Sequence, residues 1–194
     1  MQIISGLYRH KRLAAPKGGG TRPTSSFMRE SLFNICQNFI EGSHFLDIFA
    51  GSGAIGFEAL SRSASSATFI DSNKESIQCI EKNASLLQVK AQCRVLYGDV
   101  FKQLERLAKK SDKYDIIFAD PPYNTPVKAG SSLLISAEIV RFLDKHSLLA
   151  PQGCVFVEED WKFQPQLTDL KHLHLVDSRR MGDSALQRYE LINH

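Results

Sequence analysis

The sequence lacks any long apolar run. No stretch approaches the ~18 consecutive apolar residues that a membrane-spanning helix needs. The opening "MQIISGLYRHK" also lacks the apolar centre of a signal peptide. We therefore expect a cytoplasmic protein without a membrane segment.

Closely spaced cysteines are missing as well. The chain has four cysteines, and none of them form a C-x-x-C pair, the spacing typical of zinc sites and thiol redox motifs. The six histidines are scattered. We expect reduced cysteines that pack as small hydrophobic side chains, and we expect no metal site.

What the sequence does contain is a basic N-terminus on a chain of ordinary composition. The 194 residues are 43% hydrophobic and 23% charged, which is enough apolar material for one domain. Residues 1–30 carry six basic side chains against one acidic side chain, although the net charge of the chain is only +3. This asymmetry fits either a polyanionic partner or a solvated charged hairpin.

Short apolar stretches alternate with segments of helical periodicity through most of the chain. The expected strands cover residues 45–50, 67–71, 93–99, 114–120 and 154–160. Strands that are apolar throughout and separated by helices predict a parallel sheet covered on both faces. The expected fold is a doubly wound α/β domain.

Both ends of the chain read as hairpins. "QIISGLYRHKRLAAP" predicts two short strands around a turn, and "LHLVDSRRM" and "ALQRYELI" predict an antiparallel pair at the sheet edge. Between the first hairpin and the sheet, Met28, Leu32, Ile35 and Phe39 would share one helical face. We expect an N-terminal basic hairpin and loop at 1–24 and the main domain at 25–194.

A glycine-rich loop follows the first expected strand of the sheet. Gly51, Gly53 and Gly56 match the spacing G-x-G-x-x-G, which allows a tight turn and close approach of a ligand to the backbone. The match alone is weak, since any tight strand-to-helix turn favours glycine.

Three aspartates at the ends of neighbouring strands strengthen the case for a ligand. Asp47 could meet a cationic amino group, Asp71 the hydroxyls of a ribose, and Asp99 the amino group of an adenine. The carboxyl ends of adjacent parallel strands are where such sheets bind ligands. A single aspartate at such a position is more often a helix cap than a ligand contact, but the coincidence of three favours a binding site.

The stretch "FADPPY" ends the fourth expected strand. Because proline cannot donate a hydrogen bond to the ladder, the strand must stop after Asp120. Two rigid prolines, Pro121 and Pro122, are then followed directly by the aromatic Tyr123.

The stretches "LDIFAGSGAIGFEALSR", "FIDSNKES", "YGDVF" and "FADPPY" resemble the successive motifs of class I S-adenosylmethionine-dependent methyltransferases. The resemblance implies a seven-stranded sheet and S-adenosylmethionine as cofactor. The cofactor residues that it implies are Asp47, Ala50, Gly51, Ser52, Gly53, Asp71, Ser72, Asp99, Val100 and Asp120. The catalytic residues that it implies are Asp120, Pro121, Pro122 and Tyr123, a motif of enzymes that methylate exocyclic amino nitrogens.

Residues 2–34 resemble the opening of bacterial RsmD-type enzymes, and the resemblance covers nearly the whole chain. Arg22–Thr24 match an R-P-T motif, and "RESLFN" at 29–34 matches the block that follows it, while Ser5 and Met181 depart from the pattern. That family methylates N2 of a guanine in 16S ribosomal RNA, so the resemblance implies action on this RNA or on the assembling small subunit. We expect a monomer. The expected RNA contacts are Arg9, Lys11, Arg12, Arg22, Thr24 and Arg29.

Other functions stay open at this point. An adenine-N6 methyltransferase acting on DNA or RNA would use the same D-P-P-Y motif, and a protein-glutamine methyltransferase more often has asparagine in place of Asp120. A nicotinamide-dependent oxidoreductase would use the glycine loop, but it would leave Asp99 and the D-P-P-Y stretch without a role. An inactive RNA-binding module is disfavoured by the full set of aspartates.

Overall fold

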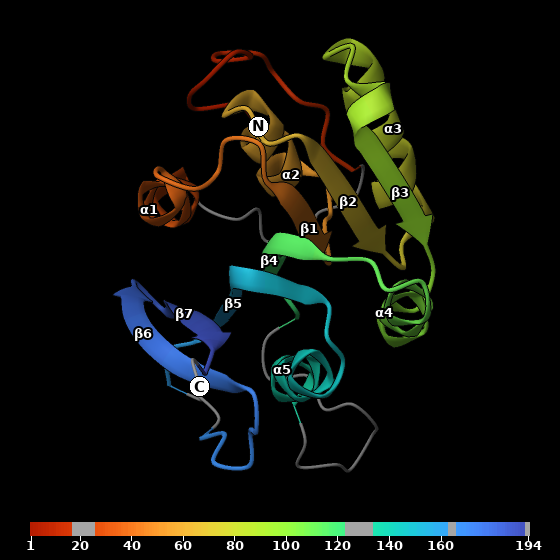
Figure 1. The fold of residues 1–194 in the computed structure, drawn as a ribbon. Helices are drawn as coiled ribbons and strands as arrows, with labels where there is room; N and C mark the ends of the chain where they lie inside the picture. The colour runs from red at the N-terminus through yellow and green to blue at the C-terminus, as the bar shows by residue number, and fades with distance from the viewer. Residues whose placement is uncertain (17–25, 123–133, 163–165, 193–194) are drawn as a thin grey trace. The chain divides into compact units, whose positions relative to one another are not determined.

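The computed structural model describes residues 1–16, 26–122, 134–162 and 166–192. The fold is mixed α/β with a seven-stranded, mostly parallel sheet, as predicted (Figure 1). The chain divides into two compact units, residues 1–103 and 104–194.

The first unit holds three parallel strands in the order β3-β2-β1. Its elements are α1 (Ser26–Cys36), β1 (His44–Ile48), α2 (Ala54–Ser61), β2 (Ser66–Asp71), α3 (Lys74–Leu86), a 3-10 turn (Lys90–Gln92) and β3 (Cys93–Tyr97). The register pairs Phe45 with Ala67 and Phe69 with Val95. Phe45 and Phe69 are fully buried, which explains why these short apolar stretches form the centre of the unit.

Helix α1 buries only part of the predicted face, on which Ile35 is half-buried. Met28 and Leu32 are buried as expected, but Phe39 is exposed. The helix ends at Cys36, so the helical spacing that would bring Phe39 onto the same face is lost. Phe33 and Cys36 complete the buried face instead.

The N-terminal segment, residues 1–16, forms only one isolated antiparallel bridge, between Gln2 and Arg12. Backbone hydrogen bonds from Ile3 to Lys11 and from Leu13 to Met1 flank the bridge. The predicted pairing is present, but regular strands are not. The turn passes through Gly6, whose φ is +82°.

The second unit combines one parallel and two antiparallel pairings in the order β4-β5-β7-β6. Its elements include β4 (Tyr114–Ala119), α5 (Ile135–Lys145), β5 (Leu149–Asp160), β6 (Leu173–Met181) and β7 (Ser184–Leu191). Helix α4 (Val100–Lys109) begins in the first unit and ends in the second. The predicted C-terminal hairpin is confirmed, and its two-residue turn contains Gly182 with φ +68°.

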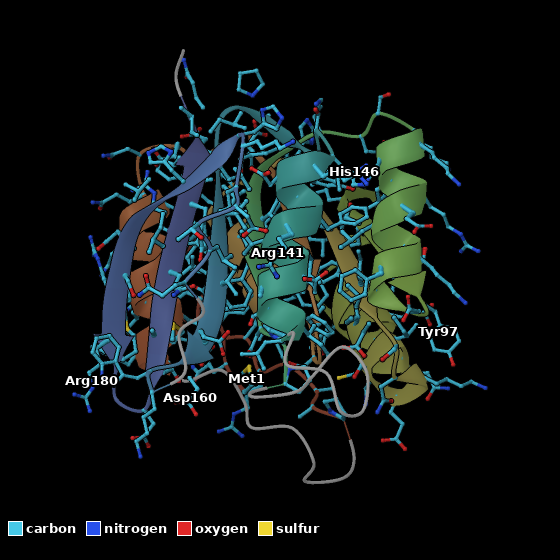
Figure 2. All side chains as sticks on the ribbon, turned by 90° about the horizontal axis from the view of Figure 1, so that it is seen from below. Met1, Tyr97, Arg141, His146, Asp160 and Arg180 are labelled. Atoms are coloured by element: carbon cyan, nitrogen blue, oxygen red, sulfur yellow. The ribbon has the colours of Figure 1, made fainter. Side chains whose placement is uncertain are left out.

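Polar side chains on α5 hold the segment that leads into β6. The Asp144 carboxylate accepts hydrogen bonds from the backbone N–H groups of Lys171, His172 and Leu173, and these lower the pKa of Asp144 against the opposing effect of its burial. Arg141, labelled on α5 in Figure 2, forms an ion pair with Asp169 at 2.8 Å. These contacts join α5 to residues that precede the final hairpin.

None of the four cysteines forms a disulfide bond, and three are buried as expected. Cys93 is half-buried, and its burial raises the pKa of the thiol to about 11. Within the described ranges, no helix is long and apolar enough to cross a membrane.

Candidate active site

The glycine loop between β1 and α2 is shaped by backbone conformation and by close packing. Gly51 and Gly53 have φ values of +55° and +76°, a region that disfavours side chains. A Cβ on Gly53 would lie 2.7 Å from the ring of Phe57, and one on Gly56 would lie 2.3 Å from Phe69. These glycines are therefore required for packing. A Cβ on Gly51, in contrast, would have no described atom within 4 Å.

Asp47 holds the end of the glycine loop through a hydrogen bond to its carboxylate. It is 1% exposed, and its Oδ2 accepts a hydrogen bond of 3.0 Å from the backbone N–H of Gly56. The carboxylate thus satisfies one of the unpaired N–H groups in the first turn of α2. A contact between Asp47 and a ligand amino group stays a prediction.

Asp71 joins the end of β2 to the glycine loop. One carboxylate oxygen accepts from the N–H of Gly51 at 2.8 Å, and the other accepts from the N–H of Asn73 at 2.8 Å. Each carboxylate oxygen has two acceptor positions, so both can still accept a hydrogen bond from a ribose hydroxyl. The loop and the carboxylate are held in place before any ligand binds.

Asp99 lies beyond β3, at the start of α4. Its side chain is exposed, and Oδ1 accepts from the N–H of Lys102 at 3.0 Å. Gln103 donates from Nε2 to the Tyr97 carbonyl at 2.8 Å, which fixes the end of β3. Asp99 is therefore a helix cap with an accessible carboxylate, so the two roles weighed from the sequence are compatible.

The remaining predicted cofactor residues of this unit differ in exposure. Ala50 is half-buried, Ser52 and Val100 are buried, and Ser72 is exposed. The Asp71 and Asp99 carboxylates fit S-adenosylmethionine, since they can accept hydrogen bonds from its ribose hydroxyls and adenine amino group. Among the described residues, nothing lies within 4 Å of a Cβ added to Gly51. Asp71 and Asp99 would hold the nucleoside part.

The second unit carries the D-P-P motif directly after β4. The last registered pair is Ala119 with Val157 of β5. Asp120 is half-buried, Pro121 is buried and Pro122 is exposed. Tyr123 lies outside the described residues. The strand ends at Ala119, as the prolines predict.

Two buried glutamates at the end of β5 had not been singled out in the sequence. Glu158 and Glu159 are 6% and 1% exposed. Burial raises the pKa of Glu159, although hydrogen bonds from the Ser136 side chain and the Asp160 backbone oppose that shift. The run "CVFVEED" reads as a strand with a polar end, and the sequence carries no signal that these carboxyls are buried.

The predicted RNA-contacting residues fall into three groups. Arg9, Lys11 and Arg12 are exposed on the N-terminal segment. Arg22 and Thr24 lie outside the described residues. Arg29 requires a correction, because it is only 5% exposed and does not face solvent.

Arg29 instead holds the N-terminal segment. Its Nη1 donates to the Gln2 carbonyl at 2.9 Å and lies 3.7 Å from Glu58. Burial lowers the pKa of Arg29, and the nearby charge of Glu58 opposes that shift. A phosphate could reach this guanidinium only if the pairing broke, so we set aside the RNA contact predicted for it.

Glu58, the partner of Arg29, also holds the N-terminal segment, and it was not predicted from the sequence. It is fully buried on α2, and its oxygens accept from the backbone N–H groups of Ile4 at 2.8 Å and Ser5 at 3.0 Å. Arg62 also pairs with it at 3.1 Å. A buried charge must be paired and hydrogen-bonded, and Glu58 meets both conditions.

The fold and the order of these motifs define a class I S-adenosylmethionine-dependent methyltransferase, so the chain is an enzyme and S-adenosylmethionine is its cofactor. The solved structure of the Escherichia coli methyltransferase yhhF matches with a TM-score of 0.80 and 31% identity, covering 98% of this chain and 97% of that chain. The methyltransferase SMU.776, complexed with S-adenosylhomocysteine, has the same fold, with a TM-score of 0.65 at 15% identity over 83% of this chain and 48% of that one.

The chain belongs to the family described as Conserved hypothetical protein 95, whose model matches residues 1–190. One relative is the ribosomal RNA small subunit methyltransferase D of Haemophilus influenzae. It is 30% identical over 190 residues, which cover 98% of this chain and 93% of the relative.

Proposed function

We propose that this methyltransferase modifies the exocyclic N2 of a guanine in 16S ribosomal RNA, either free or within the assembling small subunit. The observation that carries the proposal is the Asp120-Pro121-Pro122 sequence, which directly follows the last residue of β4. The name of the Haemophilus influenzae relative supports ribosomal RNA as the substrate class.

The chemistry requires activation of a poor nucleophile. The lone pair of an aromatic amino group is delocalised into its ring, so the nitrogen attacks weakly. Acceptance of its N–H hydrogens by the Asp120 carboxylate and the Pro121 carbonyl would draw the nitrogen towards tetrahedral geometry. The cofactor supplies an electrophilic methyl group on its sulfonium.

The prolines contribute rigidity to this arrangement. Pro121 and Pro122 each have a fixed φ, so the carbonyl of Pro121 is oriented before the base arrives. Tyr123 would offer an aromatic face on which an extruded base can stack. The same residues would serve an adenine amino group, so the choice between N2 of guanine and N6 of adenine requires identification of the methylated nucleoside.

RNA binding is assigned to the N-terminal part. We propose that residues 1–24 contact the RNA and that residues 25–194 form the methyltransferase domain. Arg9, Lys11 and Arg12 are exposed, and lysine and arginine at such positions bind phosphates and orient the RNA without reading its bases. Arg22 and Thr24 complete the proposed contact set. Action as a monomer in the cytoplasm belongs to the same proposal.

The direct test is methyl transfer from labelled S-adenosylmethionine to small ribosomal subunits from cells that lack this gene. Mass spectrometry of the nucleosides should detect N2-methylguanosine. N6-methyladenosine would support the adenine alternative, and absence of transfer both to the subunits and to free 16S ribosomal RNA would contradict a ribosomal RNA substrate.

The Asp120→Ala variant tests the catalytic role. Loss of the acceptor should lower the rate of transfer by about 10²-fold or more, while the affinity for S-adenosylhomocysteine should change little. Asp177→Ala on β6, which removes an exposed ion pair, is the matched control and should retain activity. Full activity of Asp120→Ala would refute the role assigned to Asp120.

A further inference from the structure

Asn83 on α3 makes hydrogen bonds to two separate segments of the first unit. The side chain is fully buried. Its Oδ1 accepts from the N–H of Ala14 at 2.8 Å, and its Nδ2 donates to the Ala14 carbonyl at 3.1 Å. The same Nδ2 donates to the Ser52 carbonyl at 3.0 Å. One amide therefore contacts both the N-terminal segment and the glycine loop.

The N-terminal segment reaches the same loop residue a second time. The Ser52 hydroxyl lies 3.8 Å from the sulfur of Met1, at hydrogen-bond distance for sulfur. The carbonyl of Met1 accepts a hydrogen bond from the N–H of Leu13 at 2.9 Å. The two ends of the N-terminal segment are therefore joined to each other, and both lie close to Ser52. Ser52 lies between Gly51 and Gly53, whose positive φ values already restrict the loop.

The residue type suits this position for a chemical reason. The side chain at position 83 must accept one hydrogen bond and donate two, and a carboxamide has one acceptor oxygen and two N–H donors. A carboxylate has no hydrogen to donate to the two carbonyls. An alanine would leave the buried Ser52 carbonyl and the part-buried Ala14 N–H without these partners, whereas the Ala14 carbonyl would keep the Cys79 thiol as a donor.

We propose that Asn83 is a positioning residue that couples the RNA-contacting N-terminal segment to the cofactor loop. The inference rests on the proposed function, since it takes ribosomal RNA as the partner of the segment. RNA that binds residues 1–16 would fix the position of Ala14. Because Asn83 contacts both Ala14 and the Ser52 carbonyl, the glycine loop would be fixed as well. Because such coupling is reciprocal, cofactor binding would strengthen RNA binding by the same factor.

A purely structural role for Asn83 predicts something different. Removal of a buried polar side chain would then lower the stability of the fold, and any change in cofactor affinity would be the same with and without RNA. Coupling is therefore the quantity to measure. Ser61 offers a matched comparison, because its hydroxyl holds the N-terminal segment through Tyr8 at 2.9 Å and Ser5 at 2.5 Å. No hydrogen bond from Ser61 to the glycine loop occurs among the described residues.

The experiment measures the affinity of the full chain for S-adenosylhomocysteine by calorimetry, with and without saturating 16S ribosomal RNA. In the wild type, RNA should raise the affinity about fivefold or more. In Asn83→Ala the gain should fall below about twofold, and the affinity without RNA should drop roughly fivefold for one lost hydrogen bond. Ser61→Ala should bind RNA more weakly but keep the wild-type gain.

Ala14→Pro is the second variant and carries the test if Asn83→Ala does not fold. Proline removes the N–H that donates to Asn83 and leaves the bonds from Asn83 to the Ala14 and Ser52 carbonyls. The affinity without RNA should therefore match the wild type, while the gain from RNA should be clearly smaller than in the wild type.

The outcomes separate this inference from the proposed function. If the wild type binds both ligands but RNA leaves the cofactor affinity unchanged, the coupling is refuted and the function stands. An unreduced gain in Asn83→Ala or Ala14→Pro would also refute it. If the wild type neither binds nor methylates ribosomal RNA, the proposed function fails, and the inference fails with it.

Discussion

The two ends of the chain were both predicted as hairpins, yet they are held by different forces. The N-terminal segment has a single bridge of its own and depends on buried side chains of α1, α2 and α3. The C-terminal hairpin of β6 and β7 has an antiparallel ladder along both strands, with one register shift between Leu175 and Asp177, while Leu175 and Val176 on β6 are exposed. Both ends bury apolar side chains, such as Ile3 in the first and Leu186 in the second. Beyond that burial, a few polar side chains fix the N-terminal segment, whereas a backbone ladder fixes the C-terminal hairpin.

This difference has consequences for function and for mutational sensitivity. A segment that is anchored at a few points can be loosened by one substitution, whereas a ladder distributes its stability over many hydrogen bonds. The anchored end is the basic one that we assign to RNA binding. Its anchors lie on α2 and α3, the helices that follow the glycine loop and β2, so its position is linked to the cofactor-binding unit.

The largest effect is expected for Glu58→Gln. The substitution removes the charge that pairs with Arg29 and Arg62, and it places an amide donor among N–H groups that need an acceptor. Removal of one partner from a buried ion pair costs about 3–5 kcal/mol. Urea denaturation should show this loss, and hydrogen exchange should become faster at the amides of Ile4 and Ser5.

Asp177→Asn supplies the counterpart in the C-terminal hairpin. Asp177 pairs with Arg179 at 2.6 Å, but both side chains are at least one-third exposed. An exposed pair contributes about 0–1 kcal/mol. Similar losses for Glu58→Gln and Asp177→Asn would contradict the proposed difference between the two ends.

A smaller effect is expected when the turn glycines of the two hairpins are exchanged for alanine. A Cβ on Gly6 would lie 1.8 Å from the Ser61 carbonyl oxygen, and its φ is +82°. Gly182 also has a positive φ, but nothing lies within 4 Å of its added Cβ. Gly6→Ala should therefore cost about 2–4 kcal/mol and displace the turn, whereas Gly182→Ala should cost only about 1–2 kcal/mol.

Thermal or urea unfolding of both variants checks this pair, and ribosomal RNA affinity adds a functional measurement. Displacement of the turn in Gly6→Ala should weaken RNA binding, since Arg9 and Arg12 follow the turn directly. Equal costs for the two substitutions would mean that the N-terminal turn can move away from Ser61 without loss.

The sequence predicted most of the fold because its apolar stretches are short and bounded by clear turn signals. The positions of Asp71, Asp99 and Asp120 at strand ends followed from these boundaries. The hydrogen bond from Gly51 to Asp71 could not be predicted in the same way. It joins residues that only the pairing of β1 with β2 brings together.

The anchors of the N-terminal segment were missed for the same reason. Arg29 has the pattern of a surface residue on a helix, and its burial depends on Glu58, which is 29 positions away along the chain. Asn83 has no local feature that marks it, since Ala14 and Ser52 come from other parts of the sequence. Long-range polar contacts leave no periodic signal of the kind that apolar faces leave.

A further effect concerns the C-terminal hairpin, and it is expected only at alkaline pH. Tyr189 on β7 is 2% exposed, and its hydroxyl donates to Gln187 at 2.8 Å. Burial, and then the charge of Glu159, raise the pKa of Tyr189 to about 12 from an ordinary value of 10.0. The folded state thus keeps a proton that the unfolded state loses first. The free energy of unfolding should therefore fall between pH 10 and pH 12, by roughly 2–3 kcal/mol for this shift.

Tyr189→Phe should flatten that part of the pH profile, because no phenol is left to ionise. It should lower the free energy of unfolding at neutral pH by only about 1 kcal/mol, the contribution of a typical hydrogen bond. Urea denaturation at several pH values, combined with hydrogen exchange along β7, measures both effects. An unchanged alkaline slope in Tyr189→Phe would mean that groups outside the hairpin cause it. A flattened slope would show that the loss of unfolding free energy at alkaline pH arises in the C-terminal hairpin, and not in the N-terminal segment that Glu58 holds.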